Sequence, residues 1–518
     1  MSDYMFMLES HLNADQNRVV AAVQNAASAA NMNLFLTGGA MRDMLGGFPI
    51  RDLDFAVEGN ALKVVKSVAD KSGAQVVAVD ENRRTAHLIF PGAVTAEIGM
   101  SRLEKFSKPG VKPQVTPAFI QDDLSRRDFT INSIALSLNR GSRGLLIDPT
   151  NGLADLTTKE LRTTHSYAFY EEPSRLLRLI RFRVRFGFVV DERTQRQYDN
   201  AREAELEKLI PGRVLFEELS SIADEPNAGE IMRELERAGL LAIFSMALAG
   251  PKLSVPSIAK LEKVRKLLPA GNGIRPAGVG PFLYVLTEKL NPKERLALIQ
   301  TLEMRKPEVD LWQKLEPRAK KLEQALKSVR LKLPSQVYQA LAKSPGDELL
   351  FLLYHSQQRL VQDRIRNYLQ KYYPAAQEVT DAEVEKAGGK PGTPKYQKLR
   401  EELITTRLNT RKKPEPPPSL EPAMPTGPGG PGRPPGPGRP AGPPAGPGRP
   451  AGPGGPAGPP AGPGRLAGPG RPAGPPAAGP GRPAGPGRPA GPPAAGPGRP
   501  AGPGRPPAGQ TASGRKAS

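Results

Sequence analysis

The first hundred residues switch between two patterns of apolar positions. Apolar side chains recur at helical spacing over residues 9–30, which predicts a helix, and a short apolar run over 33–37 predicts a strand that stops at a Gly-Gly pair. Polar and apolar residues alternate over 52–57, as they do in a half-buried strand. Helical spacing returns over 60–72, and further strands are predicted at 75–79, 86–90 and 94–98. This order predicts a compact α/β head with a mixed sheet.

The pattern changes after residue 100. Pro and Gly residues between 108 and 113 predict a mobile loop over 100–120. From 153 to 375 the apolar positions keep helical spacing, which predicts a helical neck and body. The expected organisation is therefore an α+β chain with three folded parts, at 1–152, 153–224 and 225–411.

The last hundred residues have a different composition. Residues 412–518 are almost entirely Pro, Gly, Ala and Arg, so they have little apolar surface to bury against the entropy of ordering. Gly does not fall at every third position, which excludes a collagen helix. We expect a disordered, extended and basic tail.

The charge balance points to a polyanionic partner. The formal net charge is +21, and residues 424–518 contribute ten Arg and one Lys with no acidic residue. A basic folded part with a basic tail favours nucleic acid before membrane, although a protein that is merely basic is the plain alternative. The absence of cysteine excludes disulfides and thiolate metal sites. We find neither a signal peptide nor an apolar stretch of membrane-spanning length, so we expect a cytoplasmic protein that does not enter a membrane.

The first candidate site combines a Gly-Gly turn with a pair of carboxylates. Gly38 and Gly39 follow a strand, so backbone N–H groups at the start of the next helix can approach a phosphate, and Arg42 can clamp it. Asp52 and Asp54 are two residues apart on a predicted strand and therefore share a face. Such a pair suits Mg²⁺ and two-metal phosphoryl transfer. Taken singly, a Gly-Gly pair is usually a turn and an Asp-x-Asp is usually a solvated strand edge.

A second candidate site is a row of arginines. Arg175, Arg178 and Arg181 recur every three residues, so they follow one helix face. Their charges repel unless anions or carboxylates face them, and a triphosphate is one candidate. A solvated basic face or a contact to an RNA backbone is the alternative.

At this point the chain resembles a known family, the class II tRNA nucleotidyltransferases (CCA-adding enzymes) and bacterial poly(A) polymerases. The resemblance covers about residues 30–190 and is carried by blocks in the family's order, at 38–43, 52–54, 123–133, 148–153 and 171–182. It implies a polymerase-β-like nucleotidyltransferase head followed by an all-helical neck and body. From 225 onward only helical character and length match, and the tail has no counterpart.

The resemblance also implies residue roles. Asp52 and Asp54 would bind the metal, and Glu97 would help to activate an RNA 3′-hydroxyl. Glu172 and Arg175 would act as an amino-acid template that hydrogen-bonds the edge of the base. The implied nucleotide-binding residues are Gly38, Gly39, Arg42, Arg127, Asp128, Glu172, Arg175, Arg178 and Arg181.

The implied function is template-independent addition of CCA from CTP and ATP to the 3′ end of tRNA. The second template acid of the family is usually Asp, and here it is Glu172, one methylene longer. The full-length segment 99–121 favours addition of A, because family members that add only C tend to have it shortened. The alternatives are an A-adding specialist, a poly(A) polymerase and a non-catalytic RNA-binding protein. A nucleotidyltransferase for small molecules fits the long helical part and the positive charge less well. Histidines 87, 165 and 355 are scattered, and we expect them to be structural.

Overall fold

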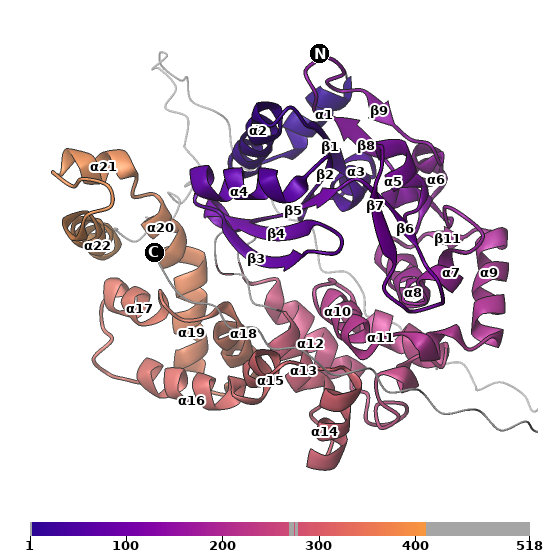
Figure 1. Ribbon diagram of the computed structural model, residues 1–518. Coiled ribbons are helices and arrows are strands. Elements are labelled where there is room, and N and C mark those ends of the chain that lie inside the picture. The colour runs from indigo at the N-terminus through magenta and orange to yellow at the C-terminus, as the bar shows by residue number, and fades with distance from the viewer. Residues whose placement is uncertain (1–2, 269–273, 275–277, 411–518) are drawn as a thin grey trace, which may run out of the picture. The chain divides into compact units, whose positions relative to one another are not determined.

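The computed structural model describes residues 3–268, 274 and 278–410, all within one compact unit, Met1–Glu421 (Figure 1). The predicted disordered tail, 412–518, lies outside the described residues. Two helices replace the single helix predicted over 9–30, namely α1 (Asp3–His11) and α2 (Ala14–Ala29). The break occurs at Asn13, which caps α2: its side chain accepts from the backbone N–H of Gln16, and the Gln16 side chain accepts in return.

A seven-stranded mixed sheet forms the first part of the chain and confirms the predicted fold class. The strand order is β3-β4-β5-β2-β1-β8-β9, with β2 and β5 parallel and the other neighbours antiparallel. The strands predicted over 33–98 are present with slightly different ends. The bounds are β1 (Asn33–Thr37), β2 (Leu53–Glu58), β3 (Gln75–Asp80), β4 (Thr85–Phe90), β5 (Val94–Met100), β8 (Ala135–Ser137) and β9 (Leu146–Ile147).

The two faces of this sheet have different roles. Leu53, Phe55 and Val57 of β2 are buried in the largest hydrophobic cluster, to which α2 and α4 (Ala61–Ser72) contribute (Figure 1). Asp54 alternates with them and therefore lies on the opposite face. Helix α3 (Gly38–Leu45) begins directly after β1 and places the Gly-Gly pair at the end of the sheet.

The prediction of a loop over 100–120 is wrong, because most of this segment forms an antiparallel hairpin. Its strands are β6 (Arg102–Lys105) and β7 (Gln114–Pro117), paired from Arg102↔Pro117 to Lys105↔Gln114. The Pro and Gly residues occupy only the connection between the strands. The side chains of Arg102 and Glu104 lie on the same face of β6, toward the protein, and form ion pairs there. Spacing along the chain does not reveal these ion pairs.

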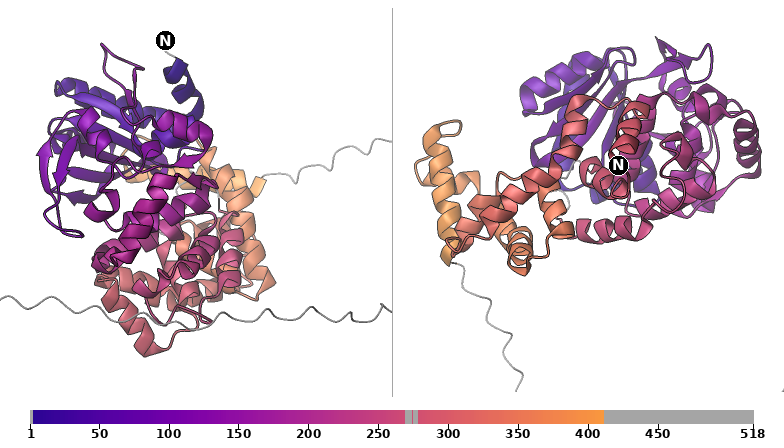
Figure 2. Two further views of the ribbon diagram at one scale, coloured as in Figure 1. Left: turned by 90° about the vertical axis from the view of Figure 1, so that its right-hand side faces the viewer. Right: turned by 90° about the horizontal axis from the view of Figure 1, so that it is seen from below.

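The region after residue 150 is almost entirely helical, as predicted (Figure 2). One small exception is the parallel pairing of β10 (Glu160–Leu161) with β11 (Val189–Val190). Helix α5 (Ile120–Ser125) precedes this region. The helices in its first half are α6 (Gly152–Thr158), α7 (Ala168–Glu171), α8 (Arg175–Phe186), α9 (Glu192–Glu203), α10 (Gly212–Ala223), α11 (Ala228–Arg237), α12 (Val255–Arg265) and α13 (Val279–Leu286). The helices after them are α14 (Pro292–Thr301), α15 (Lys306–Gln313), α16 (Leu315–Leu326), α17 (Pro334–Leu341), α18 (Gly346–His355), α19 (Arg359–Asn367), α20 (Tyr373–Gln377), α21 (Asp381–Lys386) and α22 (Pro394–Thr410).

Helix α8 connects two hydrophobic cores. Leu176, Leu179 and Phe182 belong to the cluster under the sheet, whereas Leu177 and Ile180 belong to the next cluster, built from the helices that follow. The arginines of α8 therefore stand on a helix that is fixed from two sides. The hydrophobic core of the head also includes residues after 152. The predicted domain boundaries remain predictions. Among the described residues, no helix has both the length and the apolar character needed to cross a membrane.

Candidate active site

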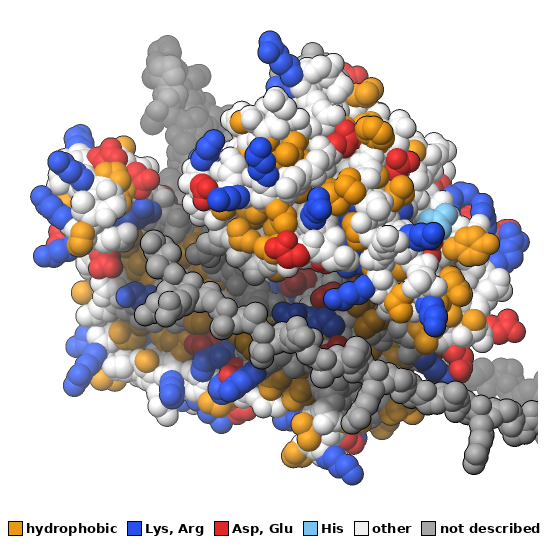
Figure 3. Space-filling model, viewed as in Figure 1, with side chains coloured by type: hydrophobic (Ala, Val, Ile, Leu, Met, Phe, Trp, Pro, Cys, Tyr) orange, Lys and Arg blue, Asp and Glu red, His pale blue; other side chains and the backbone are white. Residues whose placement is uncertain are grey.

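A cleft of ≈ 1370 Å³ collects nearly all of the predicted site residues. Its walls come from one face of the sheet, the hairpin β6–β7, and helices α8 and α10. The two carboxylates Asp54 and Glu97 line it, as do all nine of the predicted nucleotide-binding residues. Asp52 instead lines a smaller pocket of ≈ 200 Å³, which shares Gly39, Arg42 and Asp54 with the cleft. Figure 3 shows this part of the surface as a hollow with Lys and Arg side chains around it.

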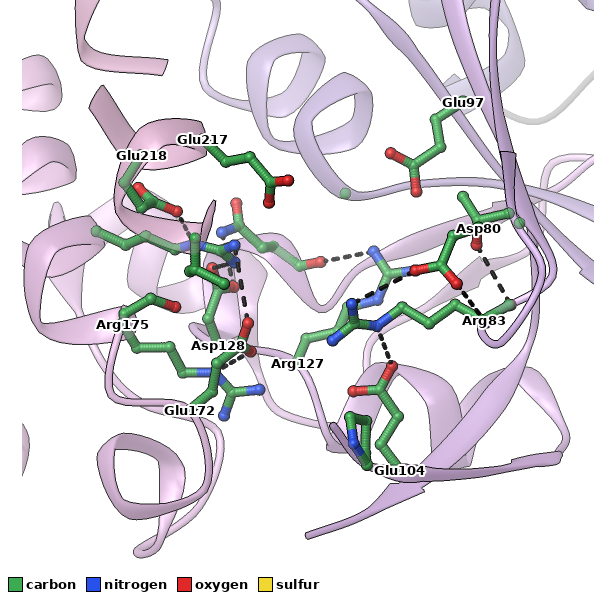
Figure 4. A pocket seen from close by; sticks show the side chains of 18 of the residues that line it. Asp80, Arg83, Glu97, Glu104, Arg127, Asp128, Glu172, Arg175, Glu217 and Glu218 are labelled. Carbon is green, nitrogen blue, oxygen red and sulfur yellow. Dashed lines mark hydrogen bonds and ion pairs between the residues drawn. The ribbon is translucent and has the colours of Figure 1, made fainter. Parts of the chain in front are cut away.

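Asp54 and Glu97 lie side by side on neighbouring parallel strands. The two residues are register partners of β2 and β5, and Glu97 is in turn the partner of His87 on β4. The three side chains therefore form a row across one face of the sheet, and Figure 4 shows Glu97 pointing into the cavity. Burial raises the pKa of Asp54 to about 7, and the neighbouring carboxylates Glu97 and Asp52 add to the rise.

Asp52 lies one residue before β2, and a side chain on the neighbouring strand β5 holds its carboxylate. Its Oδ1 accepts a hydrogen bond from the Thr95 hydroxyl on β5. Two other carboxylates lie near Asp54, and their negative charges repel its own. A divalent cation would relieve this repulsion, and carboxylate oxygens are the hard ligands that such a cation prefers. Within the described residues, no group of three or more His, Cys, Asp or Glu side chains encloses a metal position. Asp52 and Asp54 offer carboxylate oxygens, so an ion at this position would take its remaining ligands from substrate phosphates and water.

The Gly-Gly pair brings the start of α3 against Asp54. The backbone N–H of Gly39 donates to Asp54 Oδ2 at 2.7 Å. A Cβ atom at either glycine would lie 3.0 Å from the same oxygen, and Gly38 has a φ of +62°, a conformation that favours glycine. The start of α3 and the Asp54 carboxylate therefore meet at one point, beside the place where a helix N-terminus favours a phosphate.

Arg42 is buried at 5% exposure and has several protein partners. Its Nε and Nη2 both donate to Asp43 Oδ1, at 2.9 and 2.8 Å, and its Nη1 donates to Asn132 Oδ1 at 2.7 Å. Its guanidinium also lies over the Phe186 ring, 4.9 Å from the centroid. Arg42 lines both pockets, but in this structure these neighbours fix it in position.

Arg127 joins the Gly-Gly turn to α5. Its Nη2 donates to Asp123 Oδ2 at 2.8 Å and to the Thr37 hydroxyl at 3.2 Å. Its Nη1 lies 3.2 Å from the Cβ position of Gly38. Burial would raise the pKa of Asp123, but Arg127 and Arg126 outweigh it and lower that pKa below its usual range. The positive charge of Arg127 thus lies beside Asp54 at the centre of the cleft.

Carboxylates face the arginine row of α8. Arg178 Nε donates to Glu218 on α10 at 2.6 Å, and its Nη1 lies 3.4 Å from Asp128. Arg181 also contacts Glu218, at 3.3 Å, and Glu225 at 3.3 Å. The sequence left open whether bound anions or carboxylates compensate the positive charge of this row. Within the described residues, protein carboxylates compensate it.

Glu172 and Arg175 lie next to each other at the start of α8. Arg175 Nε donates to Glu172 Oε2 at 3.2 Å, and Arg178 Nη2 lies 4.0 Å from Glu172 Oε1. Burial would raise the pKa of Glu172, but Arg178 and Arg175 outweigh it and lower that pKa. Burial likewise would raise the pKa of Asp128, and the same two arginines lower it. Both acids therefore stay ionised at neutral pH.

Several cleft residues were missed by the sequence analysis. The most prominent are Arg83 on the turn after β3, Glu104 on the hairpin, and Glu218 on α10 (Figure 4). His87, expected to be structural, lies in the cleft with its Nδ1 3.6 Å from Glu97 Oε2. These positions carry no local pattern that distinguishes them from solvated surface residues.

Comparisons with known proteins find relatives among tRNA nucleotidyltransferases. The family model of the poly(A) polymerase head domain matches residues 34–162. The chain is 39% identical over 194 residues to an A-adding tRNA nucleotidyltransferase of Halalkalibacterium halodurans, a match that covers 37% of this chain and 45% of that protein. It is 35% identical over 237 residues to an A-adding tRNA nucleotidyltransferase of Aquifex aeolicus, covering 46% of this chain and 28% of that protein. The chain thus spans less than half of the length of these relatives.

A shorter relative is covered more completely. The chain is 32% identical over 273 residues to a CC-adding tRNA nucleotidyltransferase of Deinococcus radiodurans, a match that covers 51% of this chain and 69% of that protein. A solved Thermotoga maritima CCA-adding enzyme complexed with tRNA is 24% identical, with 80% of this chain and 96% of that chain covered and a TM-score of 0.43, a likeness too low to decide anything about this chain. On the sequence matches, the chain belongs to the class II tRNA nucleotidyltransferase and poly(A) polymerase family.

Proposed function

We propose that this protein adds nucleotides to the 3′ end of tRNA without a nucleic-acid template, completing CCA from CTP and ATP. The observation that carries the proposal is the row of Asp54 and Glu97 on one sheet face, beside the Gly-Gly turn and opposite the charged start of α8. Metal, phosphate and base ligands would then meet in one cleft. We place the reaction in the cytoplasm, where tRNA and nucleotides are available.

The metal of this reaction would be held by the carboxylates of the head. Nucleotidyltransferases of this family use divalent metal ions, and we assign Mg²⁺ to Asp52 and Asp54. When bound, Mg²⁺ supplies activation of the attacking hydroxyl and stabilisation of the leaving pyrophosphate. Glu97, register partner of Asp54, would accept a hydrogen bond from the 3′-hydroxyl of the RNA. Thr95 orients Asp52 through its hydrogen bond to Oδ1.

The triphosphate would lie between the Gly-Gly turn and the arginines. Gly38 and Gly39 let the start of α3 approach Asp54 closely, and Arg127 adds positive charge beside them. Arg42 supports this wall through its bonds to Asp43 and Asn132. Arg178, Arg181 and Asp128 line the same cleft, and the ion pairs among them keep its shape fixed before the nucleotide enters.

Base selection would depend on Glu172. A carboxylate accepts hydrogen bonds from an exocyclic amine, which cytosine and adenine carry and which uracil lacks. Because the pKa of Glu172 is lowered, the carboxylate remains an acceptor at neutral pH. The additional methylene relative to Asp extends the reach of the carboxylate and does not remove its acceptor role.

An A-adding specialist is the second candidate, because two of the relatives reported above are A-adding tRNA nucleotidyltransferases. The hairpin β6–β7 agrees with either candidate, since we expect addition of A to require this segment. A poly(A) polymerase and a non-catalytic RNA-binding protein are the remaining alternatives. The complete set of Asp52, Asp54 and Glu97 argues against loss of catalysis.

The experiment that separates these functions uses the purified full chain with tRNAs that end before the first C, after CC, and after the complete CCA. Each acceptor is incubated with CTP, ATP, UTP or GTP alone, with Mg²⁺. CCA addition predicts incorporation of CTP on the first acceptor and of ATP on the second. An A-adding specialist would use ATP on the second acceptor and leave the first unchanged. Long ATP extension on all three acceptors would indicate a poly(A) polymerase, and incorporation on none would contradict the proposed function.

A further inference from the structure

Glu225 is a buried carboxylate that faces arginines from two parts of the molecule. It lies two residues after the end of α10, and its side chain is 2% exposed. Its Oε1 lies 3.3 Å from Arg181 Nη1 and 3.5 Å from Arg185 Nη1, both on α8. Its Oε2 accepts a hydrogen bond of 3.1 Å from Arg51 Nη1. One carboxylate therefore joins the helix of the arginine row to the residue that directly precedes Asp52.

Arg51 depends on Glu225 more than the two α8 arginines do. Each of those arginines also contacts a second acid, Glu218 at 3.3 Å and Asp43 at 3.2 Å, respectively. Within the described residues, Glu225 is the one acid at ion-pair distance from Arg51. The Arg51 side chain is 38% exposed, so packing alone does not fix it. Loss of the charge on Glu225 would therefore release Arg51 before the arginines of α8.

Arg51 shares a pocket with the proposed metal ligands. Together with Asp52 and Asp54 it lines the smaller pocket of ≈ 200 Å³. Burial raises the pKa of Asp224, another residue of this pocket; Asp52 adds to the rise, and Arg265 and Arg51 oppose it. The charges of Asp52 and Arg51 thus act on the same neighbouring group. A guanidinium released from Glu225 would face Asp52 in this pocket.

The same pocket already contains several positive charges. Burial lowers the pKa of Arg185 to about 10, and Arg42 and Arg51 add to the fall. Glu225 and Asp43 act in the opposite direction. Like charges that crowd one another lower the pKa of a cation in this way. Glu225 therefore compensates the charge of the pocket as well as holding one side chain in it.

We propose that Glu225 is a positioning residue that holds Arg51 away from Asp52 and so keeps the aspartate pair accessible to a divalent cation. The inference rests on the proposed function, which assigns Mg²⁺ to Asp52 and Asp54. A guanidinium and a divalent cation compete for the same carboxylate oxygens, because each is stabilised by the negative charge that the other would neutralise. Glu225 acts through Arg51 and is not itself a ligand of the metal.

The test measures metal binding directly, with Mn²⁺ as the probe. Mn²⁺ takes the same hard oxygen ligands as Mg²⁺, and electron paramagnetic resonance counts its unbound form. Binding is measured on the full chain, without nucleotide or RNA, for the wild type, Glu225→Gln, Arg51→Ala and the double variant. Asp54→Asn identifies the site, since only Mn²⁺ binding that this change removes is counted.

The matched control is Glu234→Gln. Glu234 also forms an ion pair with an arginine of α8, Arg183 at 2.8 Å, and its side chain is 19% exposed. It lines neither the cleft nor the smaller pocket. The control therefore removes a comparable ion pair of the same helix at a distance from the aspartates. Urea denaturation shows whether each variant is folded.

Glu225→Gln should weaken Mn²⁺ binding by roughly tenfold, as expected when one partly screened positive charge reaches the site. Arg51→Ala should bind Mn²⁺ at least as tightly as the wild type, because the competing charge is gone. The double variant should recover most of the affinity that Glu225→Gln loses, and Glu234→Gln should keep the wild-type affinity. A role in stability alone would add the losses of the two changes instead of cancelling them.

Two results would overturn the inference: wild-type Mn²⁺ binding in Glu225→Gln, or a double variant that binds Mn²⁺ no better than Glu225→Gln. If Glu225→Gln does not fold, Arg51→Ala decides, because Arg51 is partly exposed and its loss leaves Glu225 with both α8 arginines. Weaker Mn²⁺ binding in Arg51→Ala would then contradict the inference, and equal or tighter binding would support it.

Single-turnover incorporation on tRNA with Mg²⁺ separates this inference from the proposed function. If the wild type incorporates nucleotides and Glu225→Gln binds Mn²⁺ as the wild type does, the inference fails and the function stands. If the wild type incorporates nothing but the Mn²⁺ affinities follow the expected order, the function fails and the role of Glu225 stands. A wild type without Mn²⁺ binding that depends on Asp54 overturns the inference, whatever its activity.

Discussion

The cleft has two charged walls that are built in opposite ways. On the sheet side, Asp54 lies beside Glu97 and Asp52, and burial together with these like charges raises the pKa of Asp54 to about 7. On the α8 side, every predicted site arginine faces a carboxylate, and the pKa values of Glu172 and Asp128 are lowered. Both walls are rich in acids, but the arginines around Glu172 and Asp128 outweigh the effects that raise the pKa values of these acids, whereas at Asp54 those effects prevail.

The difference indicates on which wall a bound cation would relieve repulsion and on which wall the charges are already compensated. Crowded carboxylates are stabilised by a cation, so the sheet side gains on binding a divalent metal. The α8 side is already compensated by ion pairs, so it can hold its shape with or without a nucleotide. Chemistry would then belong to the sheet side and recognition to the α8 side.

The largest effect is expected at Asp54. Asp54→Asn removes a proposed metal ligand of the sheet side and should lower nucleotide incorporation by roughly 10³-fold, because several kcal/mol of transition-state stabilisation would be lost. The measurement is single-turnover incorporation on tRNA. The free energy of unfolding should not fall, since the amide removes a charge that burial disfavours. Asp122→Asn, at an exposed position on α5, is the matched control. Unchanged incorporation in Asp54→Asn would refute the assignment of catalysis to this wall.

A large loss of stability is expected from the α8 side. Glu218 contacts both Arg178 and Arg181, and its side chain is 4% exposed. Glu218→Ala leaves two arginines without this partner and should lower the free energy of unfolding by about 3–5 kcal/mol. Urea denaturation measures the change. The neighbouring Glu217, whose side chain is 60% exposed, provides the control, and Glu217→Ala should cost no more than about 1 kcal/mol. Equal losses in the two variants would show that the ion-pair network does not support this wall.

The hairpin allows a test by pH. Burial would raise the pKa of Glu104, but Arg126 and Arg102 outweigh it and lower the pKa from 4.5 to about 2. Ionised Glu104 therefore stabilises the fold above pH 4.5, by on the order of 3 kcal/mol, and this contribution disappears as the pH falls toward 2. Unfolding curves from pH 7 to 3 should show a steeper acid loss in the wild type than in Glu104→Gln. Parallel pH profiles would place Glu104 outside the ion-pair network.

The smallest effect concerns the metal itself. Mg²⁺ at roughly tenfold its dissociation constant should raise the free energy of unfolding by about 1.4 kcal/mol, because it binds the folded sheet side and relieves the crowding of carboxylates. Thermal unfolding with and without Mg²⁺, in the absence of nucleotide and RNA, measures the shift. Asp54→Asn should lose most of this shift, and Glu218→Ala should keep it. A shift that persists in Asp54→Asn would mean that the ion stabilises the protein elsewhere.

The sequence alone determined the local parts of the molecule. The strand at 33–37, the glycine pair and the strand around Asp54 are encoded by periodicity and by residue types within about twenty positions. Such patterns depend on the geometry of one strand or one helix, so they can be read without knowing the partners. The same holds for the arginine spacing on α8 and for the helical character of the chain after residue 150.

The tertiary structure decided what faces these local elements. Arg178 meets Glu218 from 40 positions away and Asp128 from 50, and Arg83 reaches the cleft by way of Glu104 on the hairpin that the sequence indicated as a loop. An arginine row has the same local pattern whether a nucleotide or a protein carboxylate faces it. Packing of distant segments chooses between these, because the charge that compensates a buried arginine is set by which chain elements are brought within a few ångströms of it.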